Sequence, residues 1–368
     1  MRAPLAVLEK RALYICRRPY QVSRPAEACT TSCGASALLS VYCLTQCLAH
    51  LCTLSSFRVT RSRPWPTSIP SFKTRGDLHD LARHLTPPSN SRLVRLCLGS
   101  VPLHSSNLAC QHEGMEHANS AMMPMDPNIM LETNPDKNEE NRSNSYTRLL
   151  GELQFLANAT RPDITYAVNR LAAYTVNPSL QHTSALKRIL RYLSGTRDYG
   201  ITYKNSPEAP SSNLFYGYFN AAYANTEDHK STSGYVFISG GGAITWCSKK
   251  QTTIALSSLE AEYVALSEAG REACWLRNLH EELKQKQNSP TLIKGDNNGS
   301  ITMARNPQFH KQSKHIATCW HWVQDLIQDG SVMIESCHDP QQTADVLTKP
   351  LARQKHQKHV GEMGLATA

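Results

Sequence analysis

A β-type pattern over residues 214–248, followed directly by a long helical pattern, constrains the fold of this chain more than any other feature. Three short runs are typical of strands, because they are rich in aromatic and β-branched residues or alternate in polarity. They cover Leu214–Ala224, Gly234–Ser239 and Ala243–Ser248, and the glycine run 240–242 turns the chain between the last two. The pattern predicts three consecutive antiparallel strands.

The helical pattern begins at Ser257. This residue can cap the helix, and Glu260 stands three residues further on, so the two form a capping box. Glu262 lies about 200° around the helix from Glu260, and we expect it to be solvated. The apolar residues that follow recur at helical spacing and predict a buried stripe: Leu259, Tyr263, Leu266, Ala269, Ala273, Leu276, Leu279 and Leu283.

After this helix the sequence alternates between strand and helix patterns. The predicted elements are a strand at Thr291–Lys294, a helix ending at Arg305, a helix over 317–329, a strand at Val332–Cys337 and a short helix over 343–348. Upstream, apolar residues at helical spacing predict three short amphipathic helices over 147–195. This order predicts a fold of the α/β class. Its sheet is expected to be mixed, as in α+β proteins, and helices are expected to pack against it.

The basic charge of the chain is concentrated near its N-terminus. Residues 1–110 contain 14 Lys and Arg against 4 Asp and Glu, a net charge of +10, whereas the rest has a net charge of −1. They also hold 8 of the 12 cysteines, without the paired spacing of a zinc site. Because phosphate affinity follows local positive charge, the nearly neutral remainder argues against strong non-specific binding to nucleic acid. We interpret residues 1–110 as a disordered or non-homologous segment.

One uncharged stretch in this region raises the alternative of a membrane-tethered protein. No charged side chain occurs from Cys29 to Phe57, and basic residues flank the stretch on both sides. The segment 33–57 is long enough to cross a bilayer, but polar residues interrupt it and make insertion marginal. It also begins too late for an ordinary signal peptide. The expected location is therefore the cytoplasm or the nucleus.

Three carboxylates stand at the starts of predicted helices. Glu260 follows the hairpin, Asp296 separates a strand from a helix, and Asp345 opens the final short helix. Each has a purely structural interpretation, because acidic residues stabilise the first turn of a helix. Each could also be one member of a shared acidic site.

Several motifs, in order along the chain, resemble copia-type (Ty/copia) retrotransposon Pol polyproteins. The motifs LSSLEAEYVALSEA (256–269), GDNNGS (295–300) and ADVLTKPL (344–351) resemble their ribonuclease H domain. Upstream, PMDPN (124–128) and YTRLLGELQFLANATRPDITYAVNRLAAY (146–174) resemble the end of their reverse transcriptase.

The resemblance divides the chain into four parts. It implies a connector and helical reverse transcriptase remnant over 111–205, a ribonuclease H-like domain over 212–352 and a tail over 353–368, after the unassigned residues 1–110. The paired aspartates of a Y-x-D-D polymerase site do not occur in the sequence. We therefore expect no DNA synthesis from this chain alone.

The resemblance also implies a reaction, the cleavage of the RNA strand of an RNA–DNA hybrid with two Mg²⁺ ions. It assigns Glu260, Asp296 and Asp345 as catalytic and metal-binding residues, since hard cations take oxygen ligands. The position of the family's first aspartate is occupied here by Asn220. An amide offers one neutral oxygen where a bridging carboxylate is needed, so we expect weak Mg²⁺ binding and an impaired or inactive nuclease.

The expected partner is an RNA–DNA hybrid or another nucleic acid, and no small-molecule substrate is expected. Lys311, Lys314 and His315 lie in a stretch that resembles the hybrid-contacting region of the family. A non-catalytic remnant that binds nucleic acid is the alternative to a degenerate enzyme.

Overall fold

The computed structural model describes residues 118–135, 144–203, 214–282, 285–305 and 317–367. The predictions for residues 1–110, including the segment 33–57, lie outside these ranges. The same holds for Lys311, Lys314 and His315.

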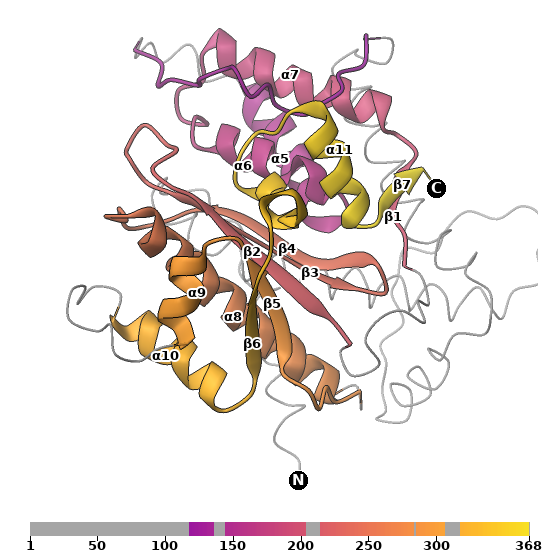
Figure 1. Ribbon diagram of the computed structural model, residues 1–368. Helices are drawn as coiled ribbons and strands as arrows, with labels where there is room; N and C mark the ends of the chain where they lie inside the picture. Colours follow the sequence, from indigo (N-terminus) through magenta and orange to yellow (C-terminus); the bar gives the residue numbers. More distant parts are fainter. Residues whose placement is uncertain (1–117, 136–143, 204–213, 283–284, 306–316, 368) are drawn as a thin grey trace, which may run out of the picture. The chain divides into compact units, whose positions relative to one another are not determined.

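A five-stranded mixed sheet forms the centre of the described chain, in the order β4-β3-β2-β5-β6 (Figure 1). Its strands are β2 (Tyr216–Ala222), β3 (Thr232–Ser239), β4 (Gly242–Lys250), β5 (Thr291–Gly295) and β6 (Val332–Ser336). The pairs β2–β3 and β3–β4 are antiparallel, whereas β5 runs parallel to β2 and β6 runs parallel to β5. This arrangement confirms the predicted mixed sheet.

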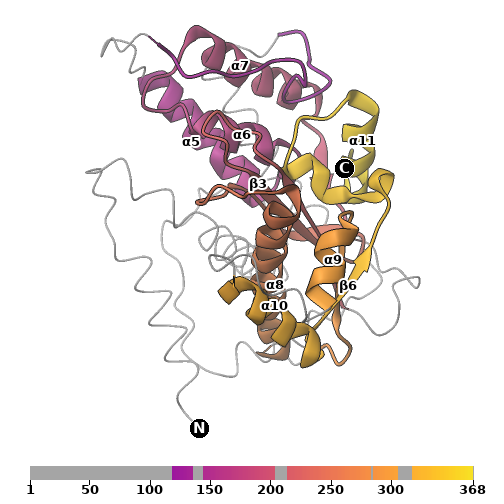
Figure 2. The same cartoon turned by 60° about the vertical axis from the view of Figure 1, so that its left-hand side comes forward.

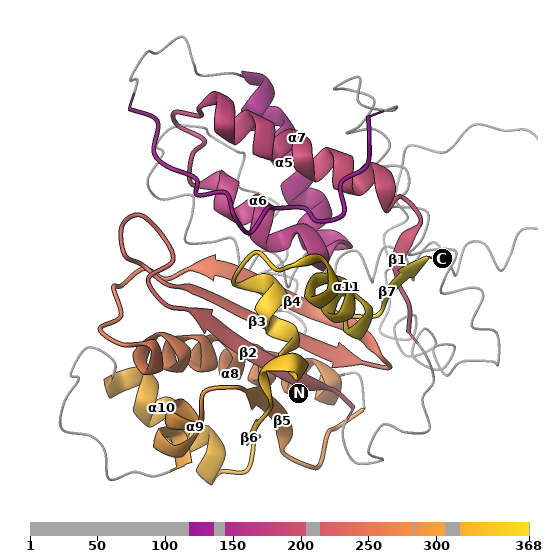
Figure 3. The same cartoon turned by 45° about the horizontal axis from the view of Figure 1, so that its top comes forward.

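Helices cover both faces of the sheet (Figure 3). On one face lies α8 (Ser258–Glu282), where Glu272 accepts a hydrogen bond from Tyr235 of β3. On the other face lies the 3₁₀ helix η5 (Thr343–Leu347), whose Val346 packs in one apolar cluster with Val236 of β3. The alternation of side chains along a strand puts these neighbouring residues on opposite faces. Figure 2 shows α10 (Ala317–Gln328) beside α8, and α9 (Asn298–Arg305) packs against both α8 and β6.

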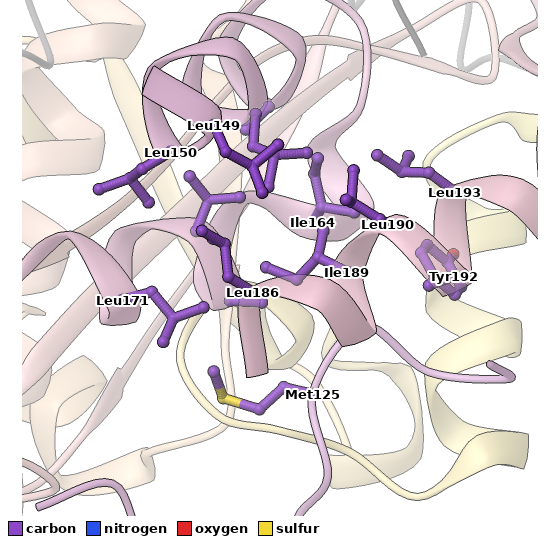
Figure 4. Packing of buried hydrophobic residues seen from close by; sticks show 14 of the residues in the cluster. Met125, Leu149, Leu150, Ile164, Leu171, Leu186, Ile189, Leu190, Tyr192 and Leu193 are labelled. Carbon is purple, nitrogen blue, oxygen red and sulfur yellow. The ribbon is translucent and has the colours of Figure 1, made fainter. Parts of the chain in front are cut away.

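The upstream helices form a second apolar cluster. They are α5 (Asn144–Ala159), η2 (Pro162–Ile164), α6 (Thr165–Ala172) and α7 (Leu180–Gly195), the last capped by Ser179. Figure 4 shows buried side chains of the cluster pointing toward one another, among them Leu149, Ile164 and Leu190. These helices confirm the amphipathic pattern over 147–195.

Residues 118–135 run as an irregular strap along α7. Met125 of the strap is buried in the helical cluster. Arg191 Nε donates to the Asn119 carbonyl at 2.7 Å, and Arg188 pairs with Asp126 at 3.4 Å. The basic face of this helix is therefore used in part to hold the strap.

Residues 353–367, which lie in the predicted tail, are folded. They form α11 (Arg353–Glu362) and β7 (Leu365–Thr367), and β7 pairs with β1 (Tyr199–Ile201) in a separate two-stranded sheet. Met363 and Val360 are buried against β3 and β4 residues in one apolar cluster. Because α11 is mostly polar, its sequence shows no apolar stripe that would have predicted it.

The edge strand β4 is covered by the upstream helices. Trp246 Nε1 donates to the Ala157 carbonyl of α5 at 2.8 Å, and Asn169 Nδ2 of α6 donates to the Ser248 carbonyl at 2.7 Å. The Ala243 N–H also donates to the Met363 carbonyl. These contacts shield an edge that could otherwise pair with another chain.

Trp246→Phe tests one of these contacts. The variant keeps an aromatic ring but removes the Nε1 donor. Since Thr165 also donates to the Ala157 carbonyl, we expect the free energy of unfolding to fall by only about 1 kcal/mol. Urea denaturation followed by circular dichroism measures this change. An unchanged midpoint would show that the hydrogen bond does not stabilise the fold.

Candidate functional site

The register of the parallel strands brings two predicted site residues to the same end of the sheet. Tyr218 of β2 lies opposite Lys294 of β5. Asn220 and Asp296 each follow two residues later, so they lie at the same level on adjacent strands. The carboxyl ends of neighbouring parallel strands are a common place for functional side chains.

A close approach of η5 to the sheet adds the third position. Gly234 of β3 lies opposite Asn220 in the antiparallel register. A Cβ atom at Gly234 would come within 2.7 Å of Thr348 Cγ2 and 2.9 Å of Leu347 Cβ. Only glycine therefore allows η5 to pack this closely and to carry Asp345 to the side of Asn220.

Asn220 is bonded directly to Asp345. Its Nδ2 donates to Asp345 Oδ1 at 2.6 Å and to Thr348 Oγ1 at 2.8 Å. The side chain of Asp345 is fully buried, and two lysines reach it. Lys349 Nζ lies 2.9 Å from Oδ1, and Lys355 Nζ lies 2.7 Å from Oδ2. Each carboxylate oxygen of Asp345 therefore lies beside the positively charged ammonium group of a lysine of the same chain.

The glutamate that joins this cluster is Glu262. The prediction that Glu262 is solvated is wrong, because only 5% of the residue is exposed. Burial, and next the charge of Asp296, raise the pKa of Glu262 to about 8. One of its neighbours is the backbone N–H of Ala221, which lowers this pKa in part by hydrogen bonding.

Glu260 does not lie in the cluster. Its Oε2 accepts a hydrogen bond from the Leu256 N–H at 2.7 Å, and its own N–H donates to Ser257 Oγ. These are the contacts of a helix start, as the capping interpretation predicted. Since the two glutamates point about 200° apart on the helix, only one of them can face the sheet.

Asp296 is the remaining acidic member. Burial, followed by the charge of Asp345, raises the pKa of Asp296, and the nearby charge of Lys349 opposes this increase. Within the described ranges, no group of three or more His, Cys, Asp or Glu side chains is placed to hold a metal ion. The carboxylates at this end of the sheet are therefore near one another without forming a complete ligand set.

No helix in the described part of the chain is long and apolar enough to cross a membrane.

The sheet order and the acidic cluster at the ends of β2 and β5 define the class: a ribonuclease H-like domain. No family model matches the chain. It is 39% identical over 221 residues to the Retrovirus-related Pol polyprotein from transposon RE2 of Arabidopsis thaliana. The match covers 60% of this chain and 15% of that polyprotein. The homologues that it matches in this way are copia-type retrotransposon Pol polyproteins, at 36–39% identity.

Two further similarities extend the comparison. The chain is 45% identical over 132 residues to Secreted RxLR effector protein 161 of Plasmopara viticola, covering 36% of this chain and 90% of that protein. It is similar to the solved structure of LC11-RNase H1, at 12% identity and a TM-score of 0.30, covering 40% of this chain and 99% of that one. Because the chain spans about 15% of the length of the Pol polyproteins it matches, the activities of a whole polyprotein are not assigned to it.

Proposed function

We propose that this chain is a Pol segment whose ribonuclease H-like domain descends from a hybrid-cleaving nuclease and has lost that activity. The observation that carries the proposal is the 2.6 Å hydrogen bond from Asn220 Nδ2 to Asp345 Oδ1. An aspartate at position 220 would repel Asp345, and a shared cation would relieve the repulsion. The amide instead satisfies Asp345 directly and carries no charge.

The residues present do not fit two Mg²⁺ ions. When bound, such a pair braces the attacking and leaving oxygens of a phosphoryl transfer, and it needs several anionic oxygens within reach. Here Asn220 is neutral, and Asp345 is held by Lys349 and Lys355. Two ions would have to displace both lysines and would still lack a bridging carboxylate.

We assign the helix position of the ancestral site to Glu262 in place of Glu260. Burial supports this assignment, as does the charge of Asp296, which acts on Glu262. Glu260 instead bonds the backbone that precedes its own helix. The proposed site positions are thus Asn220, Glu262, Asp296 and Asp345.

An RNA–DNA hybrid is the proposed ancestral substrate, and nucleic acid of this kind is the proposed partner. The resemblance of the sequence motifs supports this choice. Lys311, Lys314 and His315 stay as predicted contacts, because they lie outside the described residues.

The test is a cleavage assay with the full chain on an end-labelled RNA–DNA hybrid, in Mg²⁺ and separately in Mn²⁺. The expected result is that the wild-type chain and Asp296→Asn give the same background of product. A gel shift with the same hybrid then measures whether binding survives without cleavage. Cleavage by the wild-type chain that disappears in Asp296→Asn would overturn the proposal.

A further inference from the structure

The two faces of the sheet differ in how they are covered at β5 and β6. On the α8 face, Ile293 of β5 and Ile334 of β6 are buried, and α9 and α10 pack against β6. On the opposite face, η5 packs against β2 and β3, and α11 packs against η5. The residues of β5 and β6 that point to this second face are partly exposed, among them Met333 at 40%.

The strand register arranges these partly exposed side chains in two rows, since residues at alternate positions of a strand share a face. The row nearer the acidic cluster places side by side Tyr218 of β2, Lys294 of β5 and Glu335 of β6. The second row, two residues earlier on each strand, consists of Tyr216, Leu292 and Met333. We call these six residues the open face.

The open face carries two opposite charges on neighbouring strands. Lys294 and Glu335 are register partners, yet neither forms an ion pair with a residue that the structure describes. Lys294 instead lies over the Tyr218 ring, with Nζ 6.0 Å from the ring centroid. The open face is therefore neutral overall, and it lacks the excess positive charge by which proteins bind a nucleic-acid backbone. Its chemistry favours a protein partner.

A two-fold axis parallel to the strands, between β5 and β6, makes the open face complementary to a second copy of itself. In such an interface each contact occurs twice, once on either side of the axis. Lys294 then faces Glu335 of the partner subunit, and its own Glu335 faces Lys294 of the partner subunit. The sheets pack face to face, as in a β-sandwich. The open face also contains tyrosine and methionine, which are enriched at protein interfaces.

We propose that the open face is the interface of a homodimer, in which Lys294 of each copy pairs with Glu335 of the partner subunit. Six side chains are fewer than the roughly 20–30 residues that each partner contributes to a standard interface. We therefore expect a weak dimer in exchange with the monomer. The inference goes beyond the proposed function, because the open face does not include the acidic cluster and dimerisation does not depend on cleavage.

The experiment is sedimentation velocity of the full chain from about 1 to 200 μM, a range that detects a weak dimer. The sedimentation coefficient of the wild-type chain is expected to rise with concentration. Lys294→Glu and Glu335→Lys each place like charges opposite each other, so each should weaken the dimer at least about tenfold. The double variant, Lys294→Glu with Glu335→Lys, restores opposite charges and should bring the dissociation constant back to within about threefold of the wild-type value.

Glu281→Lys is the matched control, because it reverses an exposed carboxylate that pairs with Lys286 outside the open face. Its dissociation constant is expected to equal that of the wild-type chain. Circular dichroism shows whether each variant is folded. A wild-type monomer at every concentration, equal dimerisation by folded Glu335→Lys, or a folded double variant no tighter than the single variants would each overturn the inference.

Discussion

Replacing Asp163 by asparagine is expected to lower the free energy of unfolding by about 3–5 kcal/mol. Asp163 and Arg161 are both fully buried and form an ion pair, with Arg161 Nη2 2.7 Å from Asp163 Oδ2. Tyr192 also donates its hydroxyl to Oδ2 at 2.8 Å, and Arg161 Nη1 donates to the Thr196 carbonyl at 3.0 Å. The network ties η2 to the end of α7. The variant would leave the guanidinium charged and buried without its counter-ion.

Urea denaturation followed by circular dichroism measures the loss for the full chain. Glu281→Gln serves as the control, since it breaks an exposed ion pair with Lys286 of 3.1 Å. We expect the control to change stability by less than about 1 kcal/mol. The double variant Arg161→Met with Asp163→Leu should recover part of the loss, because it removes both charges together. Equal effects of Asp163→Asn and Glu281→Gln would contradict this account of the buried pair.

Much of the fold could be predicted from local patterns. Apolar residues at helical spacing, such as Leu149 and Leu186, predicted the upstream helices, and both are buried. The strand runs and the glycine turn predicted the antiparallel part of the sheet. These elements were predictable because each buries one face, and the spacing of apolar residues within the element indicates which face that is.

The sequence analysis did not choose Glu262 as the helix glutamate, although helical spacing offered a signal for it. The predicted stripe began at Leu259, whereas Glu262 lies four residues before Leu266 and seven before Ala269, both of which are buried. That spacing places Glu262 on the inner face of α8 and was the available signal. A charged residue at the inward end of an apolar stripe is easily assigned to solvent, because burial of a charge is usually unfavourable.

Local sequence patterns also could not predict contacts between segments that pack together only in the folded chain. The role of Lys355 depends on where α11 packs, and α11 packs against η5 and against β7, which pairs with β1. The ion pair between Lys355 and Asp345 follows from this tertiary arrangement. Asn220, by contrast, is predicted from the sequence resemblance alone as the altered site position.

Asn220→Asp is expected to create metal-dependent hybrid cleavage, with a rate at least about 100-fold above the wild-type background. The new carboxylate would replace a hydrogen-bond donor to Asp345 with a like charge, so the cluster would gain affinity for cations. Asp345 could then exchange its lysine partners for an ion. In this variant, Glu262→Gln should abolish cleavage, whereas Glu260→Gln should leave it within about threefold of the parent variant.

The most direct test of the proposed loss of activity compares the wild-type chain with Asn220→Asp on one labelled hybrid, at the same protein and Mg²⁺ concentrations. The initial rate of RNA cleavage is the quantity measured. We predict no product above background from the wild-type chain and Mg²⁺-dependent product from the variant. Equal cleavage by both chains would show that asparagine is tolerated at this position, and no cleavage by either would show that Asn220 alone did not disable the site.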